Sequence, residues 1–232
     1  MTELNLSKRL RKIASYVPKG AYFADIGTDH AYLSCFICLN DDQAVGIASD
    51  VNEGPLLAAR KTIQKYNLDH RIDTRLGDGL ETIKDEEISL VIIAGMGGSL
   101  IKEILDRGKE TLNSVNRLIL QPNVGEAPLR KWLIQNDYLI TSEELIEENG
   151  KFYEVIVADQ AKERDIFLSE KEIYFGPHLI RENSAIFKKK WLERKGKLTQ
   201  IIKQMETSEK VSKVKLAEFK RQLKWIEEVL KK

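Results

Sequence analysis

The sequence of 232 residues lacks the marks of several protein classes. Its two cysteines are too few for a disulfide framework, and its 14 glycines follow no period, which excludes collagen. No apolar run approaches the roughly 18 residues that a membrane-spanning helix requires. The N-terminus also lacks the apolar stretch of a signal peptide. We therefore expect a soluble, cytoplasmic protein with no membrane partner.

The overall composition is that of an ordinary globular chain. Hydrophobic residues make up 42% of the sequence and charged residues 31%, a balance that excludes wholesale disorder. A chain of this length fits one α/β domain, or one domain with an appendage.

The net charge of +1 conceals two oppositely charged parts. Residues 181–232 hold 16 Lys and Arg against 7 Glu and no Asp, a local net charge of +9, whereas the part before them, 1–180, carries −8. A basic appendage can attract a polyanion while the acidic part has a different task. The alternative is a solvated helical face, and the charge alone does not decide between the two interpretations.

Strand-like and helix-like segments alternate from Leu6 to Gln135. Apolar strands are predicted at 22–26, 44–48, 71–76, 90–94 and 118–120, and helices at 6–17, from about 30, and at 55–66, 99–107 and 129–135. Continuous apolar strands are typical of a parallel sheet that is covered on both faces. Two more strand-like segments, 138–146 and 152–158, flank Asn149-Gly150, the strongest short hairpin signal.

Five βα units closed by an antiparallel hairpin are typical of a class I methyltransferase sheet. The hairpin is the discriminating feature, since an ordinary dinucleotide-binding domain lacks it. We therefore predict an α/β fold, with a Rossmann-like class I methyltransferase domain over residues 1–160 and a mostly parallel, seven-stranded sheet. A polar connector over 161–182 follows, with a turn signal at Gly176-Pro177.

The remaining segment, 183–232, has helical spacing of its apolar residues. They are Phe187, Trp191, Leu198, Ile201 and Met205, followed by Leu216, Phe219, Leu223, Ile226 and Leu230. Two apolar seams of this kind, interrupted at Thr207-Ser208, predict an antiparallel helical hairpin (a coiled coil).

Ligands of an open parallel sheet bind outside the carboxyl ends of its strands. The first such turn lacks the G-x-G-x-x-G pattern of a pyrophosphate binder, since only Gly27 is glycine and Asp25 and Asp29 flank it. Two carboxylates repel a pyrophosphate, but they suit a ligand with a cationic amino-acid end, such as S-adenosyl-L-methionine.

Two further acids stand at the ends of the next strands. Asp50 follows Gly27 near the spacing at which an acidic residue accepts hydrogen bonds from ribose hydroxyls. Asp78 is placed to bond an exocyclic amine of adenine. Each of the four acids has an alternative role as a helix N-cap. That all four serve only as helix caps is the weaker interpretation.

Several motifs together resemble the bacterial TrmK family of tRNA (adenine(22)-N1)-methyltransferases. They are Asp25-Ile26-Gly27-Thr28-Asp29-His30-Ala31-Tyr32-Leu33, Gly77-Asp78-Gly79-Leu80, Ala94-Gly95-Met96-Gly97-Gly98 and Leu120-Gln121-Pro122-Asn123. The resemblance covers nearly the whole chain. It implies S-adenosyl-L-methionine as cofactor, tRNA as partner and adenine N1 as the methylated atom, and position 22 rests on the resemblance alone.

This chemistry requires little from the protein. Adenine N1 has an in-plane lone pair and attacks a methyl group without first losing a proton, and its product is a cation. A carboxylate favours that charge, so we expect Asp29 to be catalytic, either electrostatically or as a general base for the exocyclic amine. Most of the rate is expected from positioning the nucleophile and the methyl group.

The other expected site residues fall into two groups. The cofactor-binding group is Asp25, Gly27, Thr28, His30, Asp50, Asp78, Gly79, Gly95, Met96 and Gly97. The substrate-binding group is Tyr32, Gly98 and Asn123 beside the base, and Lys188, Lys189, Lys190 and Arg194 along the hairpin. Simple packing is the alternative for Met96, Tyr32 and Asn123.

A metal site is not expected. Cys35 and Cys38 match C-x-x-C but lie in an apolar helical segment without a second pair, which favours core cysteines. Two other functions remain open: methylation of another RNA, a protein or a small molecule, and RNA binding without catalysis. We expect a monomer.

Overall fold

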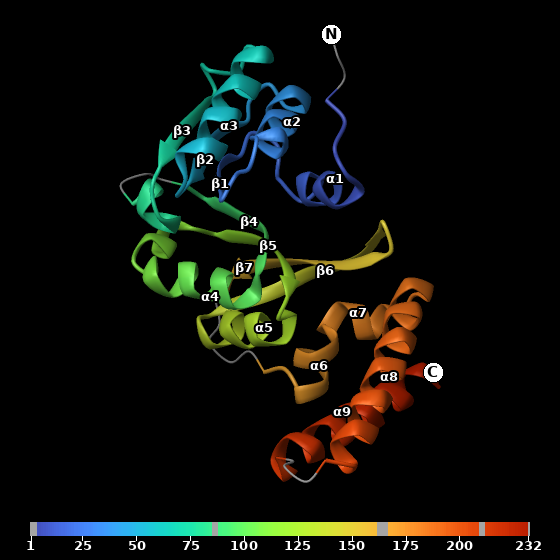
Figure 1. Ribbon diagram of the computed structural model, residues 1–232. Coiled ribbons are helices and arrows are strands. Elements are labelled where there is room, and N and C mark those ends of the chain that lie inside the picture. Colours follow the sequence, from blue (N-terminus) through green and yellow to red (C-terminus); the bar gives the residue numbers. More distant parts are fainter. Residues whose placement is uncertain (1–3, 85–87, 162–166, 209–211, 232) are drawn as a thin grey trace. The chain divides into compact units, whose positions relative to one another are not determined.

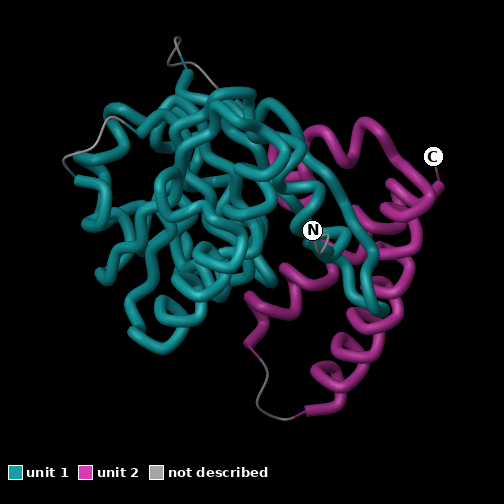
Figure 2. Tube along the Cα trace, turned by 90° about the horizontal axis from the view of Figure 1, so that it is seen from above, with its two compact units in different colours: residues 1–167 teal, residues 168–232 magenta. Residues whose placement is uncertain are grey.

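The chain folds into two compact units (Figure 2), 1–167 and 168–232. The structure, a computed structural model, describes residues 4–84, 88–161, 167–208 and 212–231. None of the helices it describes is long and apolar enough to cross a membrane.

A seven-stranded sheet forms the centre of the first unit. The strand order is β3-β2-β1-β4-β5-β7-β6. The parallel strands are β1 (Tyr22–Ile26), β2 (Val45–Asp50), β3 (Ile72–Leu76), β4 (Leu90–Gly97) and β5 (Arg117–Val124). β7 (Lys151–Gln160) pairs antiparallel with β5 and with β6 (Tyr138–Glu148). The predicted mostly parallel sheet with a closing hairpin is confirmed, and its order reverses between β1 and β4, where ligands of such sheets bind.

Helices cover both faces of this sheet (Figure 1). On one side lie α1 (Lys8–Ala14), α2 (Tyr32–Asn40) and α3 (Glu53–Lys65), and on the other lie α4 (Gly98–Arg107) and α5 (Glu126–Gln135). Two 3₁₀ helices, η1 (Gly79–Ile83) and η2 (Thr111–Ser114), complete the unit. Cys35 and Cys38 are buried in α2 as predicted, and burial raises the pKa of their thiols to about 12 and about 11.

Two strands run further than predicted. β4 continues through Gly95 and Met96 to Gly97, and β5 continues through Pro122 to Val124, instead of ending at 94 and 120. The β4–β5 register shifts at Ala94/Met96 and Met96/Gly97, so Pro122 lies where the ladder is already irregular and beyond the last β5–β7 pair, Leu120 with Ile156. A proline is tolerated at such a position. The sequence pattern misplaced both strand ends because glycines after residue 94 and a proline after residue 120 are usually turn signals.

Two helices begin later than predicted. α1 starts at Lys8 because Ser7 caps it, its Oγ accepting from the backbone N–H of Leu10 at 3.2 Å. α2 starts at Tyr32, and not near residue 30, because Ala31 has a left-handed backbone with φ of 54°.

The second unit differs from the expected connector and hairpin. Much of the expected connector, 161–182, is helical, since α6 (Glu170–Phe175) and α7 (Pro177–Glu182) lie in this unit. The capping box of Ser169 and Glu172 starts α6, and Pro177 is the first residue of α7. Such short helices carry too little periodicity for the sequence to reveal them.

The long helices α8 (Ala185–Glu206) and α9 (Lys213–Leu230) run antiparallel. Two partly exposed ion pairs link them: Lys195 bonds Glu227 at 3.0 Å, and Lys220 bonds Glu206 at 2.6 Å. In α8 the buried seam contains Ile202, where the spacing had predicted Ile201, because a straight helix drifts away from a strict heptad repeat. The predicted helical hairpin is therefore present, and Phe175 of α6 packs against Phe187 and Trp191 of α8.

A buried ion triad ties α5 to the closing hairpin of the sheet. Arg130 of α5 donates from Nε to Glu143 of β6 at 2.6 Å and from Nη2 to Glu154 of β7, and all three side chains are at most 1% exposed. Because a buried carboxylate is costly without a cation, the Arg130 guanidinium stabilises both glutamates.

Arg130→Met is expected to destabilise the protein by about 3–5 kcal/mol, since it leaves two buried carboxylates without their cation. Urea unfolding followed by circular dichroism measures the loss. As a control, replacing Arg130, Glu143 and Glu154 together by Met, Leu and Leu should cost less than the single change. A single variant as stable as the wild type would contradict this account of the triad.

Candidate active site

A cavity of about 390 Å³ opens where β1 and β4 end. It is lined by residues of three segments: the turn after β1, the end of β4 and the helix α1. They are Asp25, residues 27–33, Ala94, Gly95, Met96, Arg9 and Leu10. Six expected cofactor residues, the expected catalytic Asp29 and the expected substrate residue Tyr32 thus share one cavity.

The turn after β1 is held by backbone and side-chain hydrogen bonds. The N–H groups of Gly27 and Thr28 both donate to the Ser49 carbonyl, at 2.8 and 2.9 Å. The buried Asp25 carboxylate accepts from Thr28 Oγ1 and Ser34 Oγ, each at 2.9 Å. Burial raises the pKa of Asp25, and these two hydrogen bonds act against the rise. Ser34 was missed, because a serine inside a predicted helix carries no signal of this contact.

Glycine suits position 27 because the backbone there is left-handed and the end of the Met96 side chain lies against it. The φ of Gly27 is +74°, and a Cβ built there would lie 1.9 Å from the Cε atom of Met96. Met96 therefore rests directly on the glycine, and the end of β4 meets the turn after β1 at this contact. The two motifs, far apart in the sequence, form one wall of the cavity.

The exposed rim of the cavity is formed by Asp29, His30 and Tyr32. The Asp29 side chain is 82% exposed, and its Oδ1 lies 3.5 Å from His30 Nε2. The left-handed backbone of Ala31 brings the rings of His30 and Tyr32 together, with centroids 5.2 Å apart and planes at 21°. The rim thus offers a carboxylate beside a pair of stacked aromatic rings. One of the two residues, Tyr32, is 44% exposed.

Two amide side chains of β5 hold the bulge in β4. The Gln121 Oε1 atom accepts from the N–H of Gly95 at 3.2 Å, and Asn123 Nδ2 donates to the Gly95 carbonyl at 2.6 Å. Gln121 Nε2 also donates to Asn123 Oδ1 at 3.3 Å, which closes the ring. Asn123, expected to bond the substrate base, therefore bonds the backbone of Gly95, which has a φ of +81°.

Gly97 and Gly98 lie beyond the cavity lining. Gly98 is buried at the start of α4, and a Cβ there would lie 2.4 Å from the Gly125 carbonyl oxygen. Its small size therefore permits packing against Gly125, where the sequence had suggested close approach of a base. Gly97 has open space where a Cβ would be, so no packing constraint explains it.

Asp50 ends β2 and Asp78 follows β3, but neither residue lines this cavity. Asp50 accepts from the N–H of Asn52 at 2.8 Å and from its Nδ2 at 3.2 Å. Asp78 accepts from Arg107 of α4 through both carboxylate oxygens, at 2.5 and 3.1 Å. Neither carboxylate caps a helix through its side chain, so the capping alternative does not apply to them.

Gly79 follows Asp78 with a φ of +60°, and a Cβ there would lie 2.9 Å from the Ile104 side chain. The residue therefore serves packing between η1 and α4. Val51, 61% exposed directly after Asp50, places an apolar surface beside that carboxylate.

The residues present fit S-adenosyl-L-methionine. Asp25 and Asp29 suit an ammonium group, and Asp50 suits the two hydroxyls of a ribose. The buried Ser49 Oγ, in the strand that ends at Asp50, has no hydrogen-bond partner among the described residues, as expected of a group that awaits a polar ligand. Within the described part of the chain, no cluster of three or more His, Cys, Asp or Glu side chains could hold a metal ion.

Known proteins resemble this chain over nearly its whole length. The family model of tRNA (adenine(22)-N(1))-methyltransferase, TrmK, matches residues 23–228. The tRNA (adenine(22)-N(1))-methyltransferase of Bacillus subtilis strain 168 is 43% identical over 238 residues, which cover 99% of each chain.

Two solved structures support the same relationship. The crystal structure of the B. subtilis m1A22 tRNA methyltransferase TrmK has a TM-score of 0.90 at 40% identity and covers 98% of this chain and 100% of its own. Streptococcus pneumoniae Sp1610, in complex with S-adenosyl-L-methionine, has a TM-score of 0.86 at 37% identity and covers 97% of this chain and 100% of its own.

Gly27→Ala is expected to weaken the site in two ways: an alanine at positive φ costs about 1–2 kcal/mol of stability, and its Cβ displaces Met96. Calorimetric titration with S-adenosyl-L-homocysteine should show lower affinity. Gly54→Ala is the matched control, because Gly54 has open space and lies in α3. Equal affinities in the two variants would show that the Gly27–Met96 contact is unimportant.

Proposed function

This chain belongs to the TrmK family of tRNA (adenine(22)-N(1))-methyltransferases, and we propose how its residues divide that activity. It is an enzyme that transfers a methyl group from S-adenosyl-L-methionine to adenine N1 of tRNA, in the cytoplasm. One observation supports the division above all: the acidic, single-glycine turn after β1 and the bulge at the end of β4 line the same cavity.

The cofactor is held by the ends of β1 and β2. Asp25 and the backbone of the Gly27 turn bind the amino-acid end, and Asp50 accepts from the ribose hydroxyls. Val51 and Leu76, both more than half exposed beside these strand ends, cover the adenine ring. S-adenosyl-L-methionine, when bound, supplies an electrophilic methyl group. Asp78 is bonded to Arg107 of α4. We therefore assign Asp78 to holding α4 against η1, in preference to a contact with the adenine amine.

The target adenine is held at the rim. The ring of Tyr32, already stacked on His30, offers a face for the base, and base–aromatic stacking contributes about 1–3 kcal/mol. Gly95 carries no side chain at the cavity wall, which lets the base approach closely. These contacts place N1 in line with the methyl group, and positioning of this kind supplies much of the rate.

Asp29 supplies the charge that the reaction needs. Methylation makes the adenine cationic, and a carboxylate at the rim stabilises positive charge as it develops. The same oxygen atoms accept a proton from the exocyclic amine if the product leaves as the neutral form. His30 lies beside this carboxylate at the rim, with Nε2 3.5 Å from Asp29 Oδ1.

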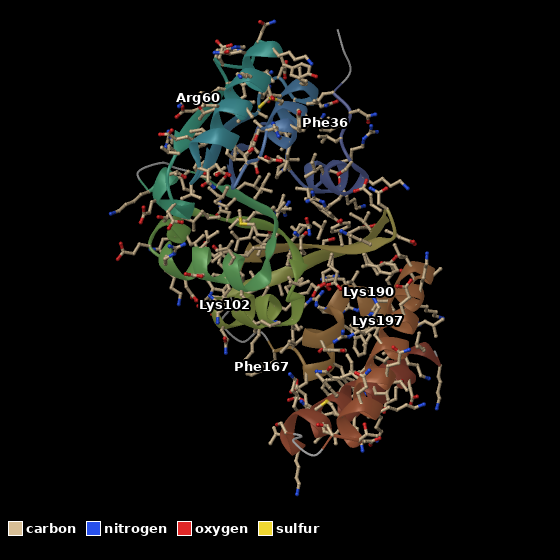
Figure 3. All side chains as sticks on the ribbon, viewed as in Figure 1. Phe36, Arg60, Lys102, Phe167, Lys190 and Lys197 are labelled. Atoms are coloured by element: carbon tan, nitrogen blue, oxygen red, sulfur yellow. The ribbon has the colours of Figure 1, made fainter. Side chains whose placement is uncertain are left out.

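The hairpin α8–α9 provides affinity for tRNA. The catalytic part of the chain is acidic, so attraction to a polyanion requires a separate basic surface. Lys189, Arg194 and Lys197 are exposed on α8, while Lys188 and Lys190 are half-buried, and Figure 3 labels Lys190 and Lys197 on this helix. The ammonium of Lys190 lies 5.3 Å from the ring centroid of Trp191.

Asp29→Asn is expected to slow single-turnover methylation of tRNA by about 10²-fold, because the amide keeps the size but loses the charge that favours a cationic product. Its affinity for S-adenosyl-L-homocysteine should stay near that of the wild type. Asp50→Ala should do the reverse and lose about 1.5–3 kcal/mol of that affinity. If Asp29→Asn reacted at the wild-type rate, positioning alone would account for the chemistry.

A triple variant reverses three exposed charges of α8: Lys189→Glu, Arg194→Glu and Lys197→Glu. It should raise the KM for tRNA about tenfold or more and flatten the dependence of that KM on salt. Cofactor affinity should not change. The matched control is Lys61→Glu, Lys65→Glu and Lys102→Glu, which changes the net charge equally on exposed positions of α3 and α4. An equal effect of both triple variants would mean that only total charge matters.

A further inference from the structure

The last residues of β4 and β5 form an exposed surface directly beyond the cavity. Met96 lines the cavity, and the next residue, Gly97, ends β4 and pairs with Val124, which ends β5. Residues that pair across neighbouring strands present their side chains on the same face of a sheet. We call Gly97 and Val124 together the shelf.

No contact among the described residues requires a glycine at position 97. The backbone there has φ of −71° and ψ of 142°, an extended conformation that any residue adopts. A Cβ on Gly97 would meet no heavy atom of these residues within 4 Å. The glycines beside it differ, since Gly95 has a positive φ and Gly98 packs against Gly125. What the missing side chain of Gly97 provides is therefore open space beside Val124.

Val124 presents an apolar side chain at this open space. It is 67% exposed, although Leu120 and Pro122 earlier in the same strand are buried. The residue before it, Asn123, donates to the Gly95 carbonyl at 2.6 Å and accepts from Gln121 Nε2 at 3.3 Å. The end of β5 is therefore held in place, and a ligand that packs on the shelf has little protein to reorder.

Methylation of adenine N1 creates a need for such a surface. N1 lies on the Watson–Crick edge, so the reacting adenine is unpaired and leaves the stack of bases around it. Each neighbouring base thereby loses a stacking partner. Proteins that bind unstacked bases offer flat side-chain surfaces as a replacement. The shelf is such a surface, one residue beyond Met96 in the cavity wall.

We propose that the shelf receives the base of a nucleotide next to the target adenine. This assignment rests on the proposed function, in which the cavity and its rim hold the target adenine and the methyl donor. The neighbouring base lies over Gly97, where no side chain obstructs it, and packs its face against Val124. Because this contact involves no base edge, the shelf accepts any of the four bases.

A double-mutant cycle tests the contact. Steady-state methylation is measured with intact tRNA and with tRNA that is abasic on the 5′ or the 3′ side of the target adenine. Val124→Ser should raise the KM for intact tRNA about 3- to 10-fold, since it removes apolar contact area. One of the two abasic tRNAs should raise the wild-type KM similarly. The variant and that tRNA together should cost little more than either change alone, because both remove one shared contact.

Filling the open space is the second test. Gly97→Ala should unfold thermally at a temperature no lower than the wild type, because alanine fits this backbone and restricts the unfolded chain. Gly97→Val, with a larger side chain, should raise the KM for tRNA about fivefold or more through steric conflict with the base. Affinity for S-adenosyl-L-homocysteine, measured by calorimetric titration, should equal that of the wild type in both variants.

Val45→Ser is the matched control for Val124→Ser. Val45 is 41% exposed at the first residue of β2, so it lies at the opposite end of the parallel strands from the cavity. This change should leave the KM for tRNA at the wild-type value. Thermal unfolding checks that each variant is folded.

Three results would overturn the shelf alone. Losses that multiply for Val124→Ser with both abasic tRNAs would show that Val124 contacts neither neighbouring base. An unchanged KM in Gly97→Val would show that no base enters the open space. Reduced affinity for S-adenosyl-L-homocysteine in Val124→Ser would assign the shelf to the cofactor. Failure of the wild-type chain to methylate intact tRNA would overturn the proposed function as well.

Discussion

The site depends on the place where the left-handed turn at Gly27 meets the end of β4 at Met96. The turn after β1 needs a residue that tolerates positive φ and leaves room for a methionine from the next strand in the sheet. Because β1 and β4 are neighbours at the point where the strand order reverses, this contact joins the two turns into one cavity. The hydrogen bonds of Asp25, Gln121 and Asn123 then hold each side of the contact in place.

The wall on the β4 side is maintained by a chain of amides. A bulge at Gly95 leaves an N–H and a carbonyl out of the regular ladder, and a backbone group without a partner is costly. Gln121 and Asn123 satisfy both, and Arg9 determines which way the Gln121 amide points. The same hydrogen-bonded chain ends at the Arg9 guanidinium, which lines the cavity.

In the proposed function, opposite charges give the two units different roles. Acids at the strand ends favour a cationic ligand end and a cationic product, but they repel a polyanion such as tRNA. The basic helices of the second unit supply the opposite charge on a separate scaffold, which holds its own aromatic group of Phe175, Phe187 and Trp191. Separating the two charges lets each surface be strong without neutralising the other.

The sequence by itself determined the succession of strands and main helices along the chain, the closing hairpin, the acidic turn at Asp25–Asp29 and the basic hairpin, because these depend on local periodicity and composition. The order of the strands within the sheet came only from the structure. It did not determine the ends of β4 and β5, the helices α6 and α7, or the partners of Asp78 and Asn123. Nor did it single out Arg9, which in the sequence is one more cation of a basic helix. Those features are decided by contacts between residues that are distant in the chain, such as Arg107 with Asp78 and Gln121 with Arg9, and only the tertiary structure brings such residues within hydrogen-bond distance.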